Sequence, residues 1–200
     1  MINMKIHKLK DKDLSILDFE LLELAAGEKR DWNAGEFEAV LVIIEGECSI
    51  DVPGLGVVDM SRKNVSDDLP SALFVGPNSQ LKFEANSKSI IAVCKAKSDE
   101  PNMPRFISPE MTKEEWRGKE SYKRKVRNIV DTGIKTQRIA VGETISLPGN
   151  WSSFPPHKHD EEIDGKEAAL EEIYFYRIRP ENGFGMQRIY TADGKTVGFR

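Results

Sequence analysis

The chain has 200 residues, which is enough for one sizeable hydrophobic core or for two small ones. With 39% hydrophobic and 31% charged residues, its composition is that of a soluble globular protein, neither a disordered chain nor a membrane-spanning one. The net charge of -4 provides no broad positive field for phosphate backbones, so we expect no nucleic-acid partner. The composition likewise leads us to expect no membrane partner.

The first hundred residues predict antiparallel β-sheet. Apolar and β-branched residues gather in six short segments separated by turn residues, at 19–25, 39–44, 48–52, 72–75, 80–84 and 90–95. Glu45-Gly46-Glu47 predicts a tight connection between the second and third segments, and Gly- and Pro-containing reversals follow at 53–56 and 76–78. We therefore expect a first β unit over residues 1–108.

A helix is predicted around residues 109–117, as a link between two β units. Ser108 can cap its start, Pro109 suits the first turn, Glu110 complements the helix dipole and Gly118 marks the end.

Beyond this link the chain again predicts β structure. Four strands are expected, at 127–134, 137–147, 174–179 and 186–191, and residues 160–169, rich in Asp, Glu, Gly and Lys, predict a mobile loop that could cover a site. Many short strands with Gly and Pro turns favour a jelly-roll barrel. The expected fold is all-β with two such units, at 1–108 and 109–200.

Both cysteines, Cys48 and Cys94, lie within apolar strand-like segments. This placement is typical of buried thiols in a reducing compartment rather than of a disulfide framework. Residues 1–12 contain no apolar stretch of the length that a signal peptide or a membrane span requires. We therefore expect a cytoplasmic protein.

Two of the three histidines, His157 and His159, stand two residues apart. In an extended strand this spacing places both imidazoles on one face, where they can bind one metal ion. A carboxylate from a neighbouring strand would complete three ligands and leave open positions for a substrate, and Glu171 and Glu172 are the candidates. An isolated His-x-His is more often a solvated strand end, so the motif alone is weak.

Glu172 begins a predicted strand in which period two places Glu172, Tyr174 and Tyr176 on one face. On their own the tyrosines are more typical of barrel core with hydroxyls at the rim, and their shared face with Glu172 is what favours a binding role. Arg177 falls on the opposite face with Phe175, which argues that it points away from the pocket.

Residues 149–160, GNWSSFPPHKHD, closely resemble the signature of bacterial 5-deoxyglucuronate isomerases. Further matches follow in order at residues 170–177 (LEEIYFYR), Pro180 and residues 183–191 (GFGMQRIYT). Upstream segments resemble the family as well, so that the resemblance spans nearly the whole chain; they are residues 22–28, 39–51, 117–118 and 124–130.

The resemblance implies a two-barrel cupin fold, a divalent metal in the C-terminal barrel, and isomerisation of 5-deoxyglucuronate to 2-deoxy-5-keto-gluconate in myo-inositol catabolism. By position, His157 and His159 match the first two metal ligands and Glu172 the carboxylate ligand. The residues do not distinguish among Zn, Mn and Fe as the bound cation. The resemblance is also compatible with a homo-oligomer. The residues expected to bind the small sugar acid are Tyr174, Tyr176, Gln187 and Arg188.

Members of that family continue beyond the length of this chain and carry a further histidine ligand on a later strand, whereas no histidine follows His159 here. The resemblance therefore implies a second barrel shortened at its C-terminal side, in either a fragment or a natural short variant. Two other functions stay open. One is a cupin that binds a sugar or serves assembly without turnover, and the other is a metal-dependent cupin oxygenase.

Overall fold

The computed structural model describes residues 6–8, 14–152, 154–191 and 193–199. Within these ranges the ordered elements are β-strands and two short 3-10 turns, which confirms the all-β prediction. No helix in the described part of the chain is long and apolar enough to cross a membrane.

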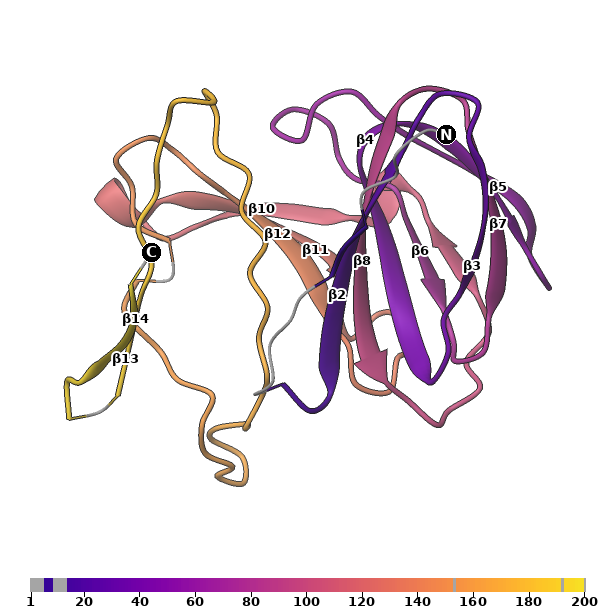
Figure 1. Ribbon diagram of the computed structural model, residues 1–200. Helices are drawn as coiled ribbons and strands as arrows, with labels where there is room; N and C mark the ends of the chain where they lie inside the picture. The colour runs from indigo at the N-terminus through magenta and orange to yellow at the C-terminus, as the bar shows by residue number, and fades with distance from the viewer. Residues whose placement is uncertain (1–5, 9–13, 153, 192, 200) are drawn as a thin grey trace.

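The first unit is a barrel of two sheets that share one long strand, β4 (Figure 1). One sheet has the strand order β1-β2-β8-β4-β6-β9, and in the other β3 pairs with β7, β7 with β4, and β4 with β5. The strands are β1 (Ile6–Lys8), β2 (Leu17–Leu24), β3 (Lys29–Asn33), β4 (Phe37–Val52), β5 (Gly56–Arg62), β6 (Ala72–Val75), β7 (Gln80–Ala85), β8 (Ser89–Lys97) and β9 (Arg105–Ile107).

The expected tight turn at Glu45–Glu47 is wrong, because β4 runs through this segment as one strand of 16 residues. Its register against β8 shifts between Ile43 and Glu45, and Gly46 has a φ of 100°. A Cβ at Gly46 would lie 2.3 Å from the carbonyl oxygen of Lys88, so only glycine allows this close approach of two backbones. The bend carries β4 from one sheet into the other.

Two apolar layers explain why β4 and β8 read as nearly continuous hydrophobic runs. One layer fills the barrel interior and includes Leu22, Leu41 and Val93. The other lies on the outer face of the sheet and includes Val40, Phe74 and Ile129, the last of which belongs to the second unit. Strands buried on both faces lose the alternation of apolar and polar residues.

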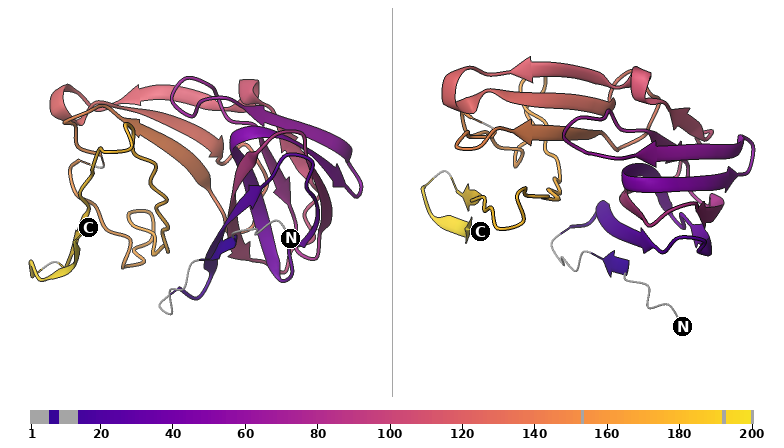
Figure 2. Two further views of the ribbon diagram at one scale, coloured as in Figure 1. Left: turned by 45° about the horizontal axis from the view of Figure 1, so that its top comes forward. Right: turned by 90° about the horizontal axis from the view of Figure 1, so that it is seen from above.

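The second unit is built on a three-stranded antiparallel sheet, β10-β11-β12, followed by a two-stranded ladder, β13-β14. Figure 2 shows the intervening segments as loops and extended runs on one side of the larger sheet. Among the described residues these strands do not close into a barrel. The elements are η1 (Pro109–Met111), β10 (Lys113–Arg117), η2 (Glu120–Tyr122), β11 (Arg124–Val130), β12 (Val141–Ser146), β13 (Arg188–Tyr190) and β14 (Thr196–Phe199).

The predicted linker helix at 109–117 is absent, and that prediction is wrong. Only the 3-10 turn η1 forms, and Ser108 makes no side-chain cap hydrogen bond to it. The rest of the segment is β10, in which Glu114 lies opposite Arg127 of β11. The Glu114 carboxylate lies 2.6 Å from Arg127 Nε and 3.2 Å from Lys125 Nζ. These cross-strand contacts override the local capping signals.

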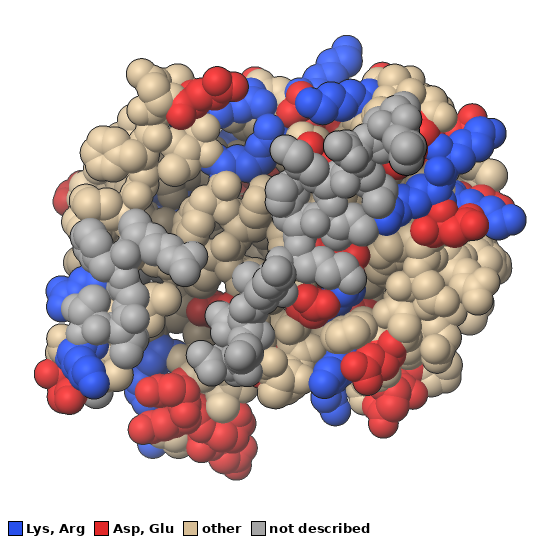
Figure 3. Space-filling view, viewed as in Figure 1, with Lys and Arg blue, Asp and Glu red and all other residues tan. Residues whose placement is uncertain are grey.

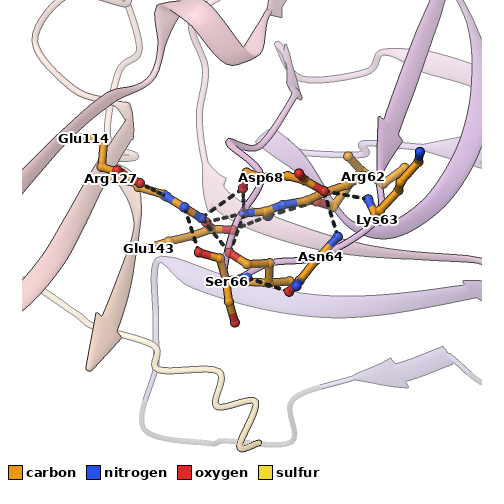
Figure 4. A network of polar contacts seen from close by, with 10 residues as sticks. Arg62, Lys63, Asn64, Ser66, Asp68, Glu114, Arg127 and Glu143 are labelled. Carbon is orange, nitrogen blue, oxygen red and sulfur yellow. Dashed lines mark hydrogen bonds and ion pairs between the residues drawn. The ribbon is translucent and has the colours of Figure 1, made fainter. Parts of the chain in front are cut away.

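A buried ionic network joins the two units (Figure 4). Arg62, at the end of β5, bonds Glu143 of β12 through both terminal nitrogens, at 2.6 and 2.8 Å. Arg127 Nη1 lies 3.5 Å from the same carboxylate. Both guanidinium side chains are 0% exposed, so their remaining N–H groups need partners inside the protein. Backbone carbonyls supply partners for the terminal nitrogens: Ile43, Val65 and Asp68 for Arg62, and Val65, Ser66 and Asp68 for Arg127. Arg62 Nε is buried without a hydrogen-bond partner among the described residues.

A second buried carboxylate, Glu38 of β4, holds the loop between β11 and β12 against the first barrel. Its carboxylate accepts hydrogen bonds from the backbone N–H groups of Gln137, Arg138 and Ile139, at 2.9, 2.6 and 3.0 Å. Three N–H donors satisfy the charge of this fully buried side chain. The loop is thereby fixed by a residue roughly a hundred positions earlier in the sequence.

Candidate metal centre

His157, His159 and Glu172 converge in the second unit, as the sequence predicts. One ligand atom of each residue lies within 4.8 Å of the others. The histidines come from the exposed segment after β12, and Glu172 comes from the extended run that returns towards the first barrel. Two imidazoles and one carboxylate form a donor set that divalent transition metals accept, so the residues present fit such an ion.

The His159 ring has a defined orientation. Its Nδ1 lies 3.4 Å from the carbonyl oxygen of Ala168, while its Nε2 lies 3.7 Å from Oε1 of Glu172. The His157 ring is 5.0 Å away and nearly perpendicular, at 80°. A backbone carbonyl on one nitrogen of a metal-binding imidazole favours the tautomer that presents the other nitrogen to the ion. The Ala168 contact therefore suits a ligand role for His159 Nε2.

The backbone around His159 brings the two halves of the site together. The amide of Leu170 donates to the carbonyl of His159 at 2.9 Å, which closes the segment 160–169 into a loop. Within it an isolated bridge joins Ile163 and Glu167, and the amide of Ala169 donates to Glu162. The predicted loop therefore exists and is exposed, and its internal contacts give it a defined shape.

Lys158, between the two histidines, anchors the acidic part of this loop. Its Nζ lies 3.3 Å from Asp160, 2.8 Å from Glu161 and 2.9 Å from Glu167. The hydrogen bonds to Glu161 and Glu167 raise the pKa of Lys158 above its ordinary value. In Figure 3 acidic side chains gather at the lower edge, where Figure 1 places this loop. Lys158 points to those carboxylates, and the histidines on either side form the candidate site.

Tyr174 and Tyr176 lie beside Glu172, as period two predicts. The Tyr174 hydroxyl donates to the Glu172 carboxylate, with both oxygens at 3.2 Å. The two phenol rings stack with centroids 6.1 Å apart. Desolvation by burial, together with the Glu172 charge, raises the pKa of Tyr176. The Tyr176 phenol therefore stays protonated near neutral pH and can donate a hydrogen bond.

Arg177 and Phe175 lie on the face opposite Glu172, as period two predicts, and this face turns towards the first barrel. Phe175 stacks on Phe19 of β2, and Arg177 lies 3.2 Å from Glu45 of β4. The predicted strand at 174–179 is nevertheless wrong as a ladder, because these residues belong to none of the sheets that the described chain forms. Side-chain contacts on alternate faces take the place of a ladder.

Glu171, the alternative carboxylate ligand, points away from the histidines. Its oxygens accept hydrogen bonds from the backbone of residues 15–17 and from the Ser15 hydroxyl. Burial alone would raise the pKa of Glu171, but these hydrogen bonds lower it to about 2. Sequence reasoning did not identify this role, because the partner amides lie more than 150 positions away.

Gln187 and Arg188, the remaining expected substrate-binding residues, lie at the start of the β13-β14 hairpin. Arg188 opens β13, and its guanidinium carbon lies 4.8 Å from the centroid of the Tyr190 ring. Gln187 precedes it and is partly buried. A role in holding a substrate stays a prediction for both residues.

Fold and site together define a cupin-type all-β protein with a candidate His-His-Glu metal centre. A family model described as KduI/IolB matches residues 3–198, and the chain therefore belongs to the KduI/IolB family. An IolB-like protein from Salmonella typhimurium LT2 has a similar crystal structure, with a TM-score of 0.86 and 28% identity over 94% of this chain and 73% of that one.

Two curated relatives are both named 5-deoxy-glucuronate isomerase. The protein from Bacillus licheniformis is 31% identical over 94% of this chain and 71% of its own length. The protein from Geobacillus kaustophilus is 33% identical over 88% of this chain and 64% of its own length. The chain thus spans about two thirds of the length of these relatives.

Proposed function

We propose that the chain is an aldose-ketose isomerase that converts 5-deoxyglucuronate to 2-deoxy-5-keto-gluconate, as a step of myo-inositol catabolism, with a divalent metal held by His157, His159 and Glu172. The convergence of these three side chains within 4.8 Å is the observation that carries the proposal. Membership of the KduI/IolB family and the names of the relatives support the reaction and the substrate.

The reaction moves a hydrogen between neighbouring carbons of a sugar through an enediol, so it needs a base, an acid and stabilisation of charge on two oxygens. A divalent cation supplies Lewis-acid polarisation of a carbonyl and its adjacent hydroxyl. His157, His159 and Glu172 would hold this cation, and Zn, Mn and Fe are the candidates.

Around this centre the side chains of the described residues supply orientation and hydrogen bonds. Tyr174 fixes the Glu172 carboxylate through its hydroxyl. The parallel rings of Tyr174 and Tyr176 offer an apolar wall with polar tips, which suits the carbon skeleton and hydroxyls of a sugar. Arg188 would recognise the acid group of the substrate through its forked donors.

The proposal places the enzyme in the cytoplasm and leaves room for a homo-oligomer. Cys48 and Cys94 are both free thiols, which suits a reducing compartment. Size-exclusion chromatography with light scattering would establish how many copies of the chain associate.

The test compares the purified chain with His157→Ala, and uses His7→Ala as the matched control because His7 is the only other histidine outside the pair. We expect about one equivalent of metal in the wild type and in the control, and much less in His157→Ala. Isomerase activity on 5-deoxyglucuronate should disappear with a chelator and return on adding metal. Equal metal content in all three proteins would refute the metal centre.

Two outcomes separate the alternative functions. Binding of the sugar acid without turnover by a metal-loaded protein would instead identify a non-catalytic binding module. Oxygen uptake with Fe(II) would identify a cupin oxygenase.

A further inference from the structure

Residues 171–177 connect the candidate metal centre to the first barrel by their alternating faces. The even positions, Glu172, Tyr174 and Tyr176, lie at the centre. Three odd positions contact the first barrel instead, through Glu171, Phe175 and Arg177. One extended run therefore links the unit that holds the histidines to a unit that holds none of the three ligands.

Glu171 makes the most specific of these contacts. Its Oε1 accepts from the Ser15 amide at 2.8 Å and from the Ser15 hydroxyl at 2.7 Å. Its Oε2 accepts from the amides of Ile16 and Leu17 at 3.0 and 2.8 Å. A carboxylate held by several donors of consecutive residues is fixed in direction as well as in position. Because Glu171 and Glu172 are adjacent, fixing one fixes the backbone from which the other projects.

Two further contacts continue the attachment along the same face. Phe175 stacks on Phe19 with ring centroids 5.4 Å apart and an angle of 29°. Arg177 Nη2 lies 3.2 Å from Glu45 Oε2. The three contacts recur at intervals of two or four residues, which keeps the run extended and holds the even side chains towards the histidines.

Side-chain contacts matter here because the run lacks a backbone ladder in the described part of the chain. In a barrel strand, hydrogen bonds to both neighbours set the direction of every side chain. Here the direction of the Glu172 side chain depends on the contacts that the neighbouring side chains make with the first barrel. The anchor with the largest number of hydrogen bonds is Glu171.

We infer that the first barrel is the template that positions the metal carboxylate, with Glu171, bound to the backbone of residues 15–17, as the positioning residue for Glu172. This inference rests on the proposed metal centre and deepens it. It assigns to the barrel without metal ligands a direct part in building the site of the other unit. Glu171 itself would not be a ligand, because its oxygens are bound to residues 15–17.

The test measures Co(II) binding by calorimetry and by the visible spectrum of the bound ion, on the full chain. Glu171→Ala should weaken Co(II) binding by about 10- to 100-fold, the range found for residues that orient metal ligands, and should shift the spectrum because Glu172 is no longer held in place. The exposed Glu181, on the turn after the run, provides the matched control. Glu181→Ala should retain the affinity and spectrum of the wild type.

A second variant distinguishes positioning from a general loss of structure. Glu171→Gln keeps the side-chain length and one carbonyl acceptor, so it should retain the fold and recover part of the affinity, with a remaining loss of about threefold or more. If Glu171→Ala is unfolded by circular dichroism, Glu171→Gln provides the test by the same two measurements. A residue that contributes only to stability would lower the unfolding midpoint and leave the affinity of the folded protein unchanged.

The outcomes distinguish a failure of the proposed metal centre from a failure of the positioning role of Glu171. If the wild type does not bind Co(II), or His157→Ala binds it equally well, the metal centre is wrong and the inference is wrong with it. If binding depends on His157 while both Glu171 variants match the wild type in affinity and spectrum, the positioning role is refuted and the proposed function stands.

Discussion

Replacing Glu143 by glutamine should reveal how strongly the two units depend on their shared ionic network. The substitution keeps the shape of the side chain and removes the one carboxylate among the described residues that bonds Arg62, through contacts of 2.6 and 2.8 Å. The Arg62 side chain is 0% exposed, so water cannot solvate its charge when the carboxylate is removed. Removing one partner of a buried ion pair costs about 3 to 5 kcal/mol. Because carbonyl oxygens continue to bond Arg62, we expect about 3 kcal/mol.

Urea unfolding, followed by tryptophan fluorescence, measures this free energy directly. At about 2 to 4 °C per kcal/mol for a chain of this size, the melting temperature should fall by roughly 6 to 12 °C. The exposed Lys29–Glu84 pair, at 3.1 Å, provides the control, and Glu84→Gln should change stability by less than about 1 kcal/mol. Equal effects of Glu143→Gln and Glu84→Gln would refute the reasoning.

Three further predictions concern the core and the loops. Burial raises the pKa of Cys48 from 9.0 to about 11 and that of Cys94 from 9.0 to about 12. Because the thiols of the unfolded chain then ionise at lower pH than those of the folded protein, the free energy of unfolding should fall as pH rises from 9 towards 12. Replacing each cysteine by alanine should make this dependence on pH weaker. Gly46→Ala should cost at least about 2 kcal/mol in urea unfolding, against about 1 kcal/mol for Gly27→Ala, where nothing lies within 4 Å of the added Cβ. Glu38→Ala should release residues 137–139, so that limited proteolysis cuts there faster than in the wild type; an unchanged rate would argue against the anchor.

The sequence predicts most of the first barrel because its strands are marked by local composition. Segments such as 72–75 and 80–84 carry apolar residues between turn residues, and both appear as strands with nearly the same bounds. The tight turn at Glu45–Glu47 was wrong because glycine serves a bend as well as a reversal. Only the contact of Gly46 with the backbone at Lys88 distinguishes the two, and that contact is not local.

The helix at 109–117 fails for a related reason. Ser108, Pro109 and Gly118 carry genuine helix signals, yet Glu114 gains more from pairing with Arg127 across a ladder. Strand β3, by contrast, is missed because its exposed positions are charged or polar and only Trp32 is a large apolar residue facing the core.

The side chains of the candidate site could be predicted more completely than the strands around it. Period two is a property of any extended chain, so the faces of Glu172 and Arg177 were correct even though no ladder forms there. The choice between Glu171 and Glu172 as the ligand followed from the family resemblance. What holds Glu171 could not be found, because the amides of residues 15–17 carry no sequence signal.

The attachment of residues 171–177 to β2 and β4 has a consequence for the order of events during synthesis. The ribosome releases the N-terminal end first, and domains fold as units in that order. Every strand of the first barrel ends by Ile107, well before Glu171 is added to the chain. The surface of β2 and β4 that contacts residues 171–177 can thus be folded before these residues leave the ribosome. They would then bind to a surface that is already formed.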